Sequence, residues 1–231
     1  MKTRNEYLEE IQNDLQSGRN VLVVGPPGIG KSELLKTLKD VLFNKATPAT
    51  LINVSWLRVA GLEVRGPIGD GAMFWNLVDH KLIEDRANIM LFDDVEIVLD
   101  QFRNDFAFAV GLEHATAGSN RIVAAARDSL ASPLLYGPRI AQVFRKFVIV
   151  PIGPLTETES IDLTLLESDQ IGFDPFPNFS TLTAAASGGI PGVIKSIVNA
   201  RPNDTESHTE AANQALAKMA KQMESLGEPN R

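Results

Sequence analysis

Hydrophobic residues form short unbroken runs along the first 150 residues. Five runs are rich in aliphatic, β-branched or aromatic residues, and they lie at 21–24, 51–55, 89–92, 122–126 and 147–150. Such runs are typical of strands buried on both faces of a parallel sheet. Helical patterns, with apolar residues three or four positions apart, precede the first run at 5–17 and separate several of the others. This alternation predicts an α/β fold built on a five-stranded parallel sheet.

The pattern changes after Pro151, where strands end and three helices are predicted, at 157–168, 179–187 and 191–200. Thr156 and Glu159 have the spacing of a capping box at the first of these helices. We therefore expect three parts, which are an α/β domain over 1–150, a small helical lid over 151–202 and an amphipathic tail over 203–231.

The tail predicts a helix over 206–226 with an apolar seam. Its members are alternately four and three residues apart: Ala212, Leu216, Met219, Met223 and Leu226. Two heptads are too short to be stable alone, so we expect the seam to dock on this chain or on a partner.

Composition narrows the classes of function. The 231 residues include no cysteine, which excludes a disulfide scaffold, a thiolate nucleophile and a zinc site with cysteine ligands. The net charge of −7 argues against a surface that binds nucleic acid as a whole, although a local basic patch for DNA remains open. No run of 18 apolar residues and no N-terminal signal core occur, so we expect a cytoplasmic protein without a membrane span.

A glycine-rich loop after the first predicted strand carries the strongest chemical signal. It reads Gly25, Pro26, Pro27, Gly28, Ile29, Gly30, Lys31 and Ser32, and a helix follows. In this strand–loop–helix context the glycines let backbone amides face a phosphate, and the helix N-terminus adds positive potential. Lys31 is expected to reach the β- and γ-phosphates of ATP, and Ser32 to bind Mg²⁺. The pattern predicts a P-loop nucleotide site.

Acidic residues follow the third predicted strand. Asp93 comes directly after 89–92, at the carboxyl edge where open α/β sheets bind ligands. We interpret Asp93 as the acid on the metal side and Asp94 as the residue that orients or deprotonates the attacking water. Glu96 is a second candidate for that role, and a merely solvated acidic turn is the alternative.

Arg127 ends the next predicted strand, 122–126, at the same edge of the sheet. Adjacent strands would bring it close to the γ-phosphate, so we interpret it as a phosphate sensor. The alternative is an arginine that pairs with a nearby acid such as Asp128.

With these motifs, residues 1–200 resemble the AAA+ and STAND branch of P-loop ATPases. Gly25–Ser32 resembles Walker A, and Asp93 with Asp94 resembles Walker B. AAA+ chains usually carry Asp-Glu in Walker B, whereas Asp-Asp is closer to NB-ARC-like proteins. An arginine at the position of Arg127 is also closer to those proteins. Pro191, in Gly-Gly-Ile-Pro-Gly, is similar to the lid proline of STAND proteins, which packs on the nucleotide; a plain helix-start proline is the alternative.

The resemblance also implies partners. AAA+ rings complete a site with an arginine of the next subunit, and Arg145 is our first choice for it, ahead of Arg139; a solvated helix-end arginine is the alternative. In many AAA+ proteins a loop after the second strand touches a polymer substrate, and here Arg58 and Arg65 of the loop 58–71 could contact its phosphates. An ordinary surface loop is the alternative. Large STAND effector domains are missing, so we expect a homo-oligomer or a separate partner protein, as in small AAA+ helpers of transposition or replication loading.

The leading hypothesis is a Mg²⁺-dependent ATPase that acts as a conformational or assembly switch. A nucleotide-stabilised regulatory subunit that does not hydrolyse ATP is the alternative, because Asp stands at position 94 in place of Glu. A small-molecule kinase is disfavoured, since no arginine cluster follows residue 150.

Overall fold

The computed structural model describes residues 2–53, 70–127 and 129–227. The chain divides into two compact units. The sheet unit comprises Tyr7–Gly25 and Lys31–Pro151, and the helical unit comprises Met1–Glu6, Pro26–Gly30 and Ile152–Arg231. The segment Pro26–Gly30 of the glycine-rich loop thus belongs to the same unit as the C-terminal helices.

Five parallel strands form the sheet, in the order β2-β3-β4-β1-β5. They are β1 (Val21–Val24), β2 (Ala49–Ile52), β3 (Ile89–Phe92), β4 (Arg121–Ala126) and β5 (Val148–Pro151). The predicted fold class, a five-stranded parallel α/β sheet, is confirmed. The second strand begins two residues earlier than predicted because Ala49 pairs with Ile89, and the buried Thr50 hydroxyl donates to Asp85 Oδ2 at 2.8 Å.

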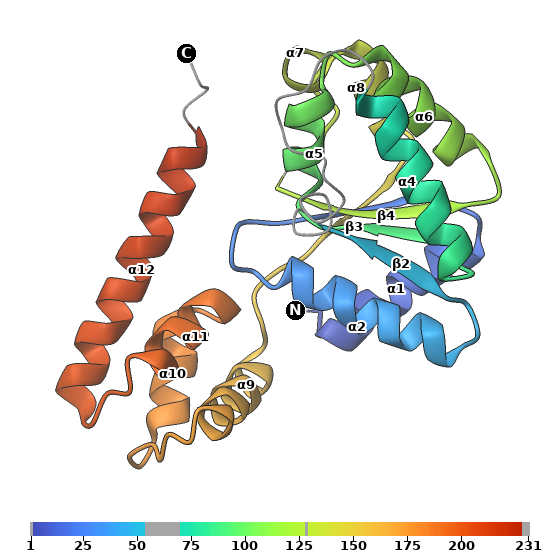
Figure 1. The fold of residues 1–231 in the computed structure, drawn as a ribbon. Helices are drawn as coiled ribbons and strands as arrows, with labels where there is room; N and C mark the ends of the chain where they lie inside the picture. The colour runs from blue at the N-terminus through green and yellow to red at the C-terminus, as the bar shows by residue number, and fades with distance from the viewer. Residues whose placement is uncertain (1, 54–69, 128, 228–231) are drawn as a thin grey trace. The chain divides into compact units, whose positions relative to one another are not determined.

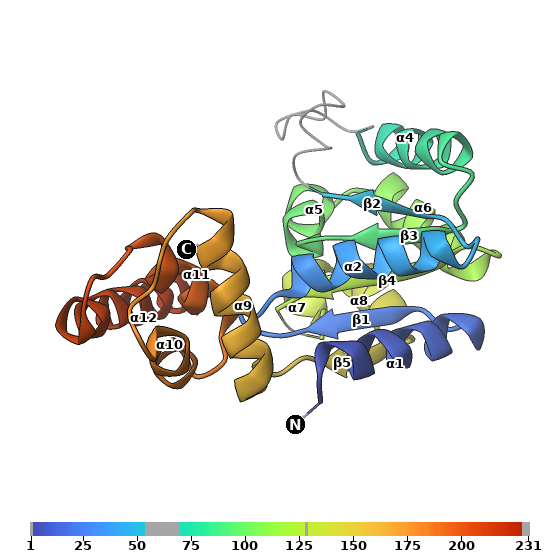
Figure 2. The same cartoon turned by 90° about the horizontal axis from the view of Figure 1, so that it is seen from below.

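Helices cover both faces of the sheet (Figures 1 and 2). Helices α1 (Arg4–Gln16) and α2 (Lys31–Asn44) lie on one face, and α4, α5, α6 and α8 lie on the other. The remaining bounds are α4 (Asp70–Glu84), α5 (Val95–Phe102), α6 (Phe106–Ala117), α7 (Pro133–Tyr136) and α8 (Pro138–Phe144). Crossovers of this kind are what parallel strands require.

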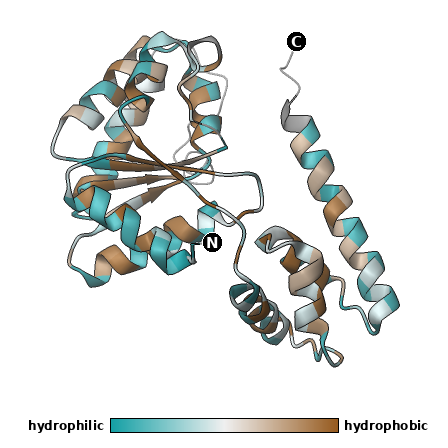
Figure 3. Ribbon diagram, turned by 180° about the vertical axis from the view of Figure 1, so that it is seen from behind, coloured by the Kyte–Doolittle hydropathy of each residue, from teal (hydrophilic) through white to brown (hydrophobic). Residues whose placement is uncertain are grey.

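The main core lies between the sheet and α4, α5 and α6. The strands are mostly apolar (Figure 3), and a cluster of aromatic rings packs against them. Phe74 is fully buried, and Trp75 packs edge-on to it while donating from Nε1 to the Phe108 carbonyl at 2.9 Å. The core anchors the strand ends that carry the predicted acids.

Four helices form most of the helical unit: α9 (Glu157–Gln170), α10 (Phe179–Ser187), α11 (Pro191–Asn199) and α12 (Thr205–Gly227). The predicted capping box at α9 is confirmed, since the Thr156 hydroxyl accepts from the Glu159 N–H and the Glu159 carboxylate accepts from the Thr156 N–H. Their core is built around Phe179, Ile194 and Ile197. In the part of the chain that the structure describes, no helix has the length and apolarity to cross a membrane.

The prediction of a heptad seam on α12 is partly wrong. Ala212 and Met219 pack on the helical core, but Leu216 and Met223 are exposed. Ala215 is buried in place of Leu216, because the first half of α12 docks on α10 and α11 through a face of small residues one position away from the seam.

Candidate functional site

The two ends of the glycine-rich loop are anchored within the sheet unit. Gly25 follows β1, and its N–H donates to the Ala126 carbonyl of β4 at 3.2 Å. Lys31 opens α2, and its Nζ donates back to the Gly25 carbonyl at 2.7 Å. Burial lowers the pKa of Lys31, whereas the carboxylates of Glu96, Asp94 and Asp93, in decreasing order, act to raise it. The lysine thus stands as a cation among acids at the carboxyl edge of the sheet.

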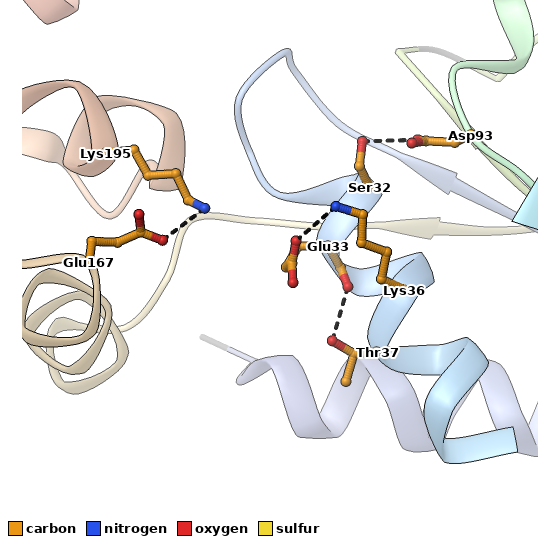
Figure 4. Close-up of polar contacts among 7 residues, drawn as sticks. All are labelled: Ser32, Glu33, Lys36, Thr37, Asp93, Glu167 and Lys195. Carbon is orange, nitrogen blue, oxygen red and sulfur yellow. Dashed lines mark hydrogen bonds and ion pairs between the residues drawn. The ribbon is translucent and has the colours of Figure 1, made fainter. Parts of the chain in front are cut away.

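Ser32 and Asp93 meet at this edge (Figure 4). The Ser32 hydroxyl donates to Asp93 Oδ1 at 3.0 Å, and the Asp93 N–H is fixed by the Ile52 carbonyl at 2.9 Å. Burial raises the pKa of Asp93, the charge of Asp94 adds to this, and the hydrogen bond from Ser32 opposes it. A half-buried carboxylate of this kind is stabilised in its charged form by a cation.

The two oxygens of Ser32 and Asp93 fit Mg²⁺, which binds hard oxygen donors and usually keeps several water molecules. Among the described residues, no group of three or more His, Cys, Asp and Glu side chains forms a metal cage.

The strand that carries the acid does not neighbour the strand that leads into the phosphate loop, because β4 lies between β3 and β1. Ser32 reaches Asp93 because it lies in the first turn of α2, beyond the sheet edge. The two residues are 61 positions apart in the sequence.

Asp94 has an unusual backbone. It adopts the left-handed conformation, with φ 47° and ψ 50°, at the N-cap of α5, and its side chain makes no capping hydrogen bond. Aspartate tolerates this region better than most residues, but it is sparsely populated. The turn leaves Asp94 exposed while Asp93 points to Ser32.

Glu96 is bound to Arg127. Its buried carboxylate accepts from the Arg127 backbone N–H and forms an ion pair with Arg127 Nε at 3.4 Å. Burial raises the pKa of Glu96, and the hydrogen bond from Arg127 lowers it. Arg127 therefore does have an acidic partner, which is Glu96; Asp128 lies outside the described residues.

The central loop segment and Pro191 come together within the helical unit. Gly28 and Gly30 have φ of +74° and +95°, which non-glycine residues rarely adopt. The Gly192 N–H donates to the Gly28 carbonyl at 3.0 Å, and a Cβ at Gly30 would lie 3.5 Å from Pro191 Cγ. Pro191 is also the first residue of α11, as a helix-start proline would be, and its packing on a nucleotide stays a prediction.

Lys195, Arg145 and Arg139 have ordinary surroundings. Lys195 forms an ion pair with Glu167 at 2.8 Å (Figure 4). Arg145 is the exposed C-cap of α8, and Arg139 lies over the Phe106 ring, 4.5 Å from its centroid. Arg58 and Arg65 lie outside the described residues.

Solved structures show which fold this is. Domain III of the replication initiation protein DnaA from Thermotoga maritima has a TM-score of 0.60 at 14% identity, over 90% of each chain. The Walker-type ATPase PABY2304 of Pyrococcus abyssi scores 0.60 at 14% identity, over 98% of this chain and 75% of that one. The AAA domain of FIGL-1, solved with ADP, scores 0.59 at 14% identity, over 86% and 72%.

These neighbours include a Walker-type ATPase and an AAA domain, and this chain has the fold that they share. No protein-family model matches the sequence, and a search of curated proteins gave no match.

Proposed function

We propose that this chain binds ATP with Mg²⁺ and hydrolyses it, acting as a nucleotide-driven conformational or assembly switch. The observation that carries the proposal is the contact of Ser32 with Asp93 beside the buried Lys31, where a phosphate loop meets an acid at the sheet edge. The fold supports it, because solved neighbours include a Walker-type ATPase and an AAA domain bound to ADP.

Each side chain has a separate task in this proposal. The amides of the loop and Lys31 bind the β- and γ-phosphates, and the Ser32 and Asp93 oxygens hold Mg²⁺, which supplies charge neutralisation to the transferred phosphoryl group. Asp94 orients the attacking water. Arg127, held by Glu96, senses the γ-phosphate.

Phosphate release by the purified chain tests the proposal. We expect steady hydrolysis with ATP and Mg²⁺, and none with EDTA or in Lys31→Ala. Lys36→Ala is the matched control, because Lys36 lies in the same helix but is exposed and pairs with Glu33 at 3.5 Å (Figure 4). Hydrolysis by Lys31→Ala at the wild-type rate would contradict the assignment.

The alternative is a regulatory subunit that binds nucleotide without turnover. Two observations favour it: Asp94 is one methylene shorter than the glutamate usual at this position, and Glu96 is occupied by Arg127. ATP binding without phosphate release, also after addition of a partner or DNA, would support this alternative over the ATPase.

We also propose a subtype and a location. The Asp93–Asp94 pair, Arg127 and Pro191 support a STAND or NB-ARC-like relative. We propose that it acts in the cytoplasm, where ATP is available. The likeness to a replication initiation protein supports a helper that assembles on DNA, as a homo-oligomer or with a partner protein. Light scattering with ATP, with ADP and with neither, each with and without DNA, tests this; one mass under all conditions would contradict the assembly role.

A further inference from the structure

Arg4 joins three segments that are far apart in sequence. Its backbone N–H donates to Glu159 Oε1 at 2.8 Å, and its guanidinium donates through Nη1 to the Gly153 carbonyl at 3.0 Å and through Nη2 to the Ile29 carbonyl at 2.6 Å. All four residues belong to the helical unit. The arginine therefore links the start of α1, the glycine-rich loop, the segment before α9 and α9 itself.

The contact with Ile29 acts on a particular peptide group. The Ile29 carbonyl and the Gly30 N–H belong to one planar trans peptide, so the two groups point in opposite directions. A donor fixed on the carbonyl thus sets the direction of the Gly30 N–H. A charged donor also polarises the peptide and makes its N–H a stronger donor.

The neighbouring peptide is held in the same way. The Gly192 N–H donates to the Gly28 carbonyl at 3.0 Å, and the Ile29 N–H of the same peptide donates to the Pro26 carbonyl at 3.4 Å. Two successive loop carbonyls are therefore bound, and the Gly30 N–H, on the far side of the second peptide, is the kind of donor that contributes to an anion-binding nest.

We propose, on the basis of the proposed function, that Arg4 is a positioning residue for the phosphates. It holds the Ile29–Gly30 peptide so that the Gly30 N–H faces the β-phosphate, and it does not touch the nucleotide itself. The bond to Gly153 fixes the guanidinium, and the bond to Glu159 fixes the Arg4 backbone. Partial burial would raise the pKa of Glu159, but the hydrogen bonds from Arg4 and Thr156 outweigh this and lower it, so the carboxylate stays charged.

If Arg4 has this role, its loss should weaken the binding of phosphates with or without a nucleoside. Calorimetric titrations of ATP, ADP and inorganic tripolyphosphate into Arg4→Ala should all show about ten- to a hundredfold weaker binding, the range expected for one charge-assisted hydrogen bond. The loss should be similar for the three ligands, because all engage the same amide. A folded protein that is merely less stable keeps its affinity, so a structural role alone would leave these constants unchanged.

Two further variants sharpen the test. Arg201→Ala is the matched control, since Arg201 also donates to a carbonyl of the helical unit, that of Ile171 at 3.0 Å, and should bind all three ligands as wild type does. Arg4→Lys keeps the charge but not the fork of donors, so its affinity should lie between those of wild type and Arg4→Ala. If Arg4→Ala does not fold, Arg4→Lys decides the question.

The outcomes separate the two levels of the proposal. The role of Arg4 is overturned if Arg4→Ala binds the ligands with wild-type affinity. If only Arg4→Lys folds, wild-type affinity in that variant overturns it. The role is also overturned if ATP binds more weakly while tripolyphosphate binds as before, because the arginine would then act on the nucleoside. A wild-type chain that binds none of the three ligands overturns the proposed function, and the inference falls with it.

Discussion

The Ser32 hydroxyl lies 3.0 Å from Asp93 Oδ1, although the strands that precede the two residues are separated by β4. The contact brings one neutral and one half-buried acidic oxygen to the edge of the sheet where Lys31 is also found. Both oxygens are directed by short, fixed segments, the first turn of α2 and the end of β3.

Asp93→Asn tests the metal side of this pair. The amide keeps the size of the side chain but removes the charge that would balance Mg²⁺, so hydrolysis should fall about a hundredfold or more and its response to Mg²⁺ should be lost. Phosphate release measured across a Mg²⁺ titration reports both effects. Asp100→Asn, an exposed acid of α5, should leave the titration unchanged. A normal Mg²⁺ response in Asp93→Asn would remove Asp93 from the metal site.

Asp94→Asn separates binding from chemistry. The variant should bind ATP like wild type and lose hydrolysis by about 10²–10⁴-fold, the range of a general base. Single-turnover phosphate release is the measurement, with Glu96→Gln in parallel. If Asp94→Asn retains turnover and Glu96→Gln loses it, Glu96 acts on the water and its contact with Arg127 is not its only task.

Arg145→Ala tests completion of the site by a neighbour. The variant should bind ATP but fail to hydrolyse it alone, and mixing with Asp94→Asn, which has an intact Arg145, should restore part of the activity. An arginine of this kind contributes about 10³–10⁵ in rate where it operates. Lys146→Ala, the next exposed cation, is the control. Undiminished turnover in Arg145→Ala would make Arg145 an ordinary surface residue.

The burial of His208 should make the protein less stable in mild acid. The ring is buried in the helical unit, 3.0 Å from the Thr183 hydroxyl and edge-on to Phe179. Burial lowers its pKa from the ordinary value of 6.5. The unfolded chain therefore binds this proton first, and the free energy of unfolding falls as pH decreases below about 6.5, until the folded histidine is protonated as well.

Melting temperatures between pH 7.5 and 5 measure this effect. Wild type should lose stability over that interval, and His208→Gln, which has no titrating group there, should lose less. His114→Gln serves as a control. An equal loss in wild type and His208→Gln would show that other groups cause the pH dependence.

The sequence predicted the parts of the site that are local. Val21–Val24 and Ile89–Phe92 are apolar runs whose lengths fix where Gly25 and Asp93 emerge, and the structure places them there. The order of strands is not local, so the pairing of Glu96 with Arg127 across β3 and β4 could not be read from the sequence.

Two other features depended on packing between distant segments. Arg4 carried no local signal, because its partner Glu159 is 155 residues away. On α12 the periodicity correctly predicted a helix, but the shape of α10 and α11 selects Ala215 over Leu216 for burial.

In the proposed function, Lys31 and the loop bind the phosphates of ATP. Calorimetric titration of ATP with Mg²⁺ into wild type, Lys31→Ala and Lys36→Ala measures this binding. We predict one saturable site in wild type and in Lys36→Ala, and no detectable binding in Lys31→Ala, which lacks the cation for the β- and γ-phosphates. Equal affinity in Lys31→Ala and wild type, or no binding by wild type, would contradict the account.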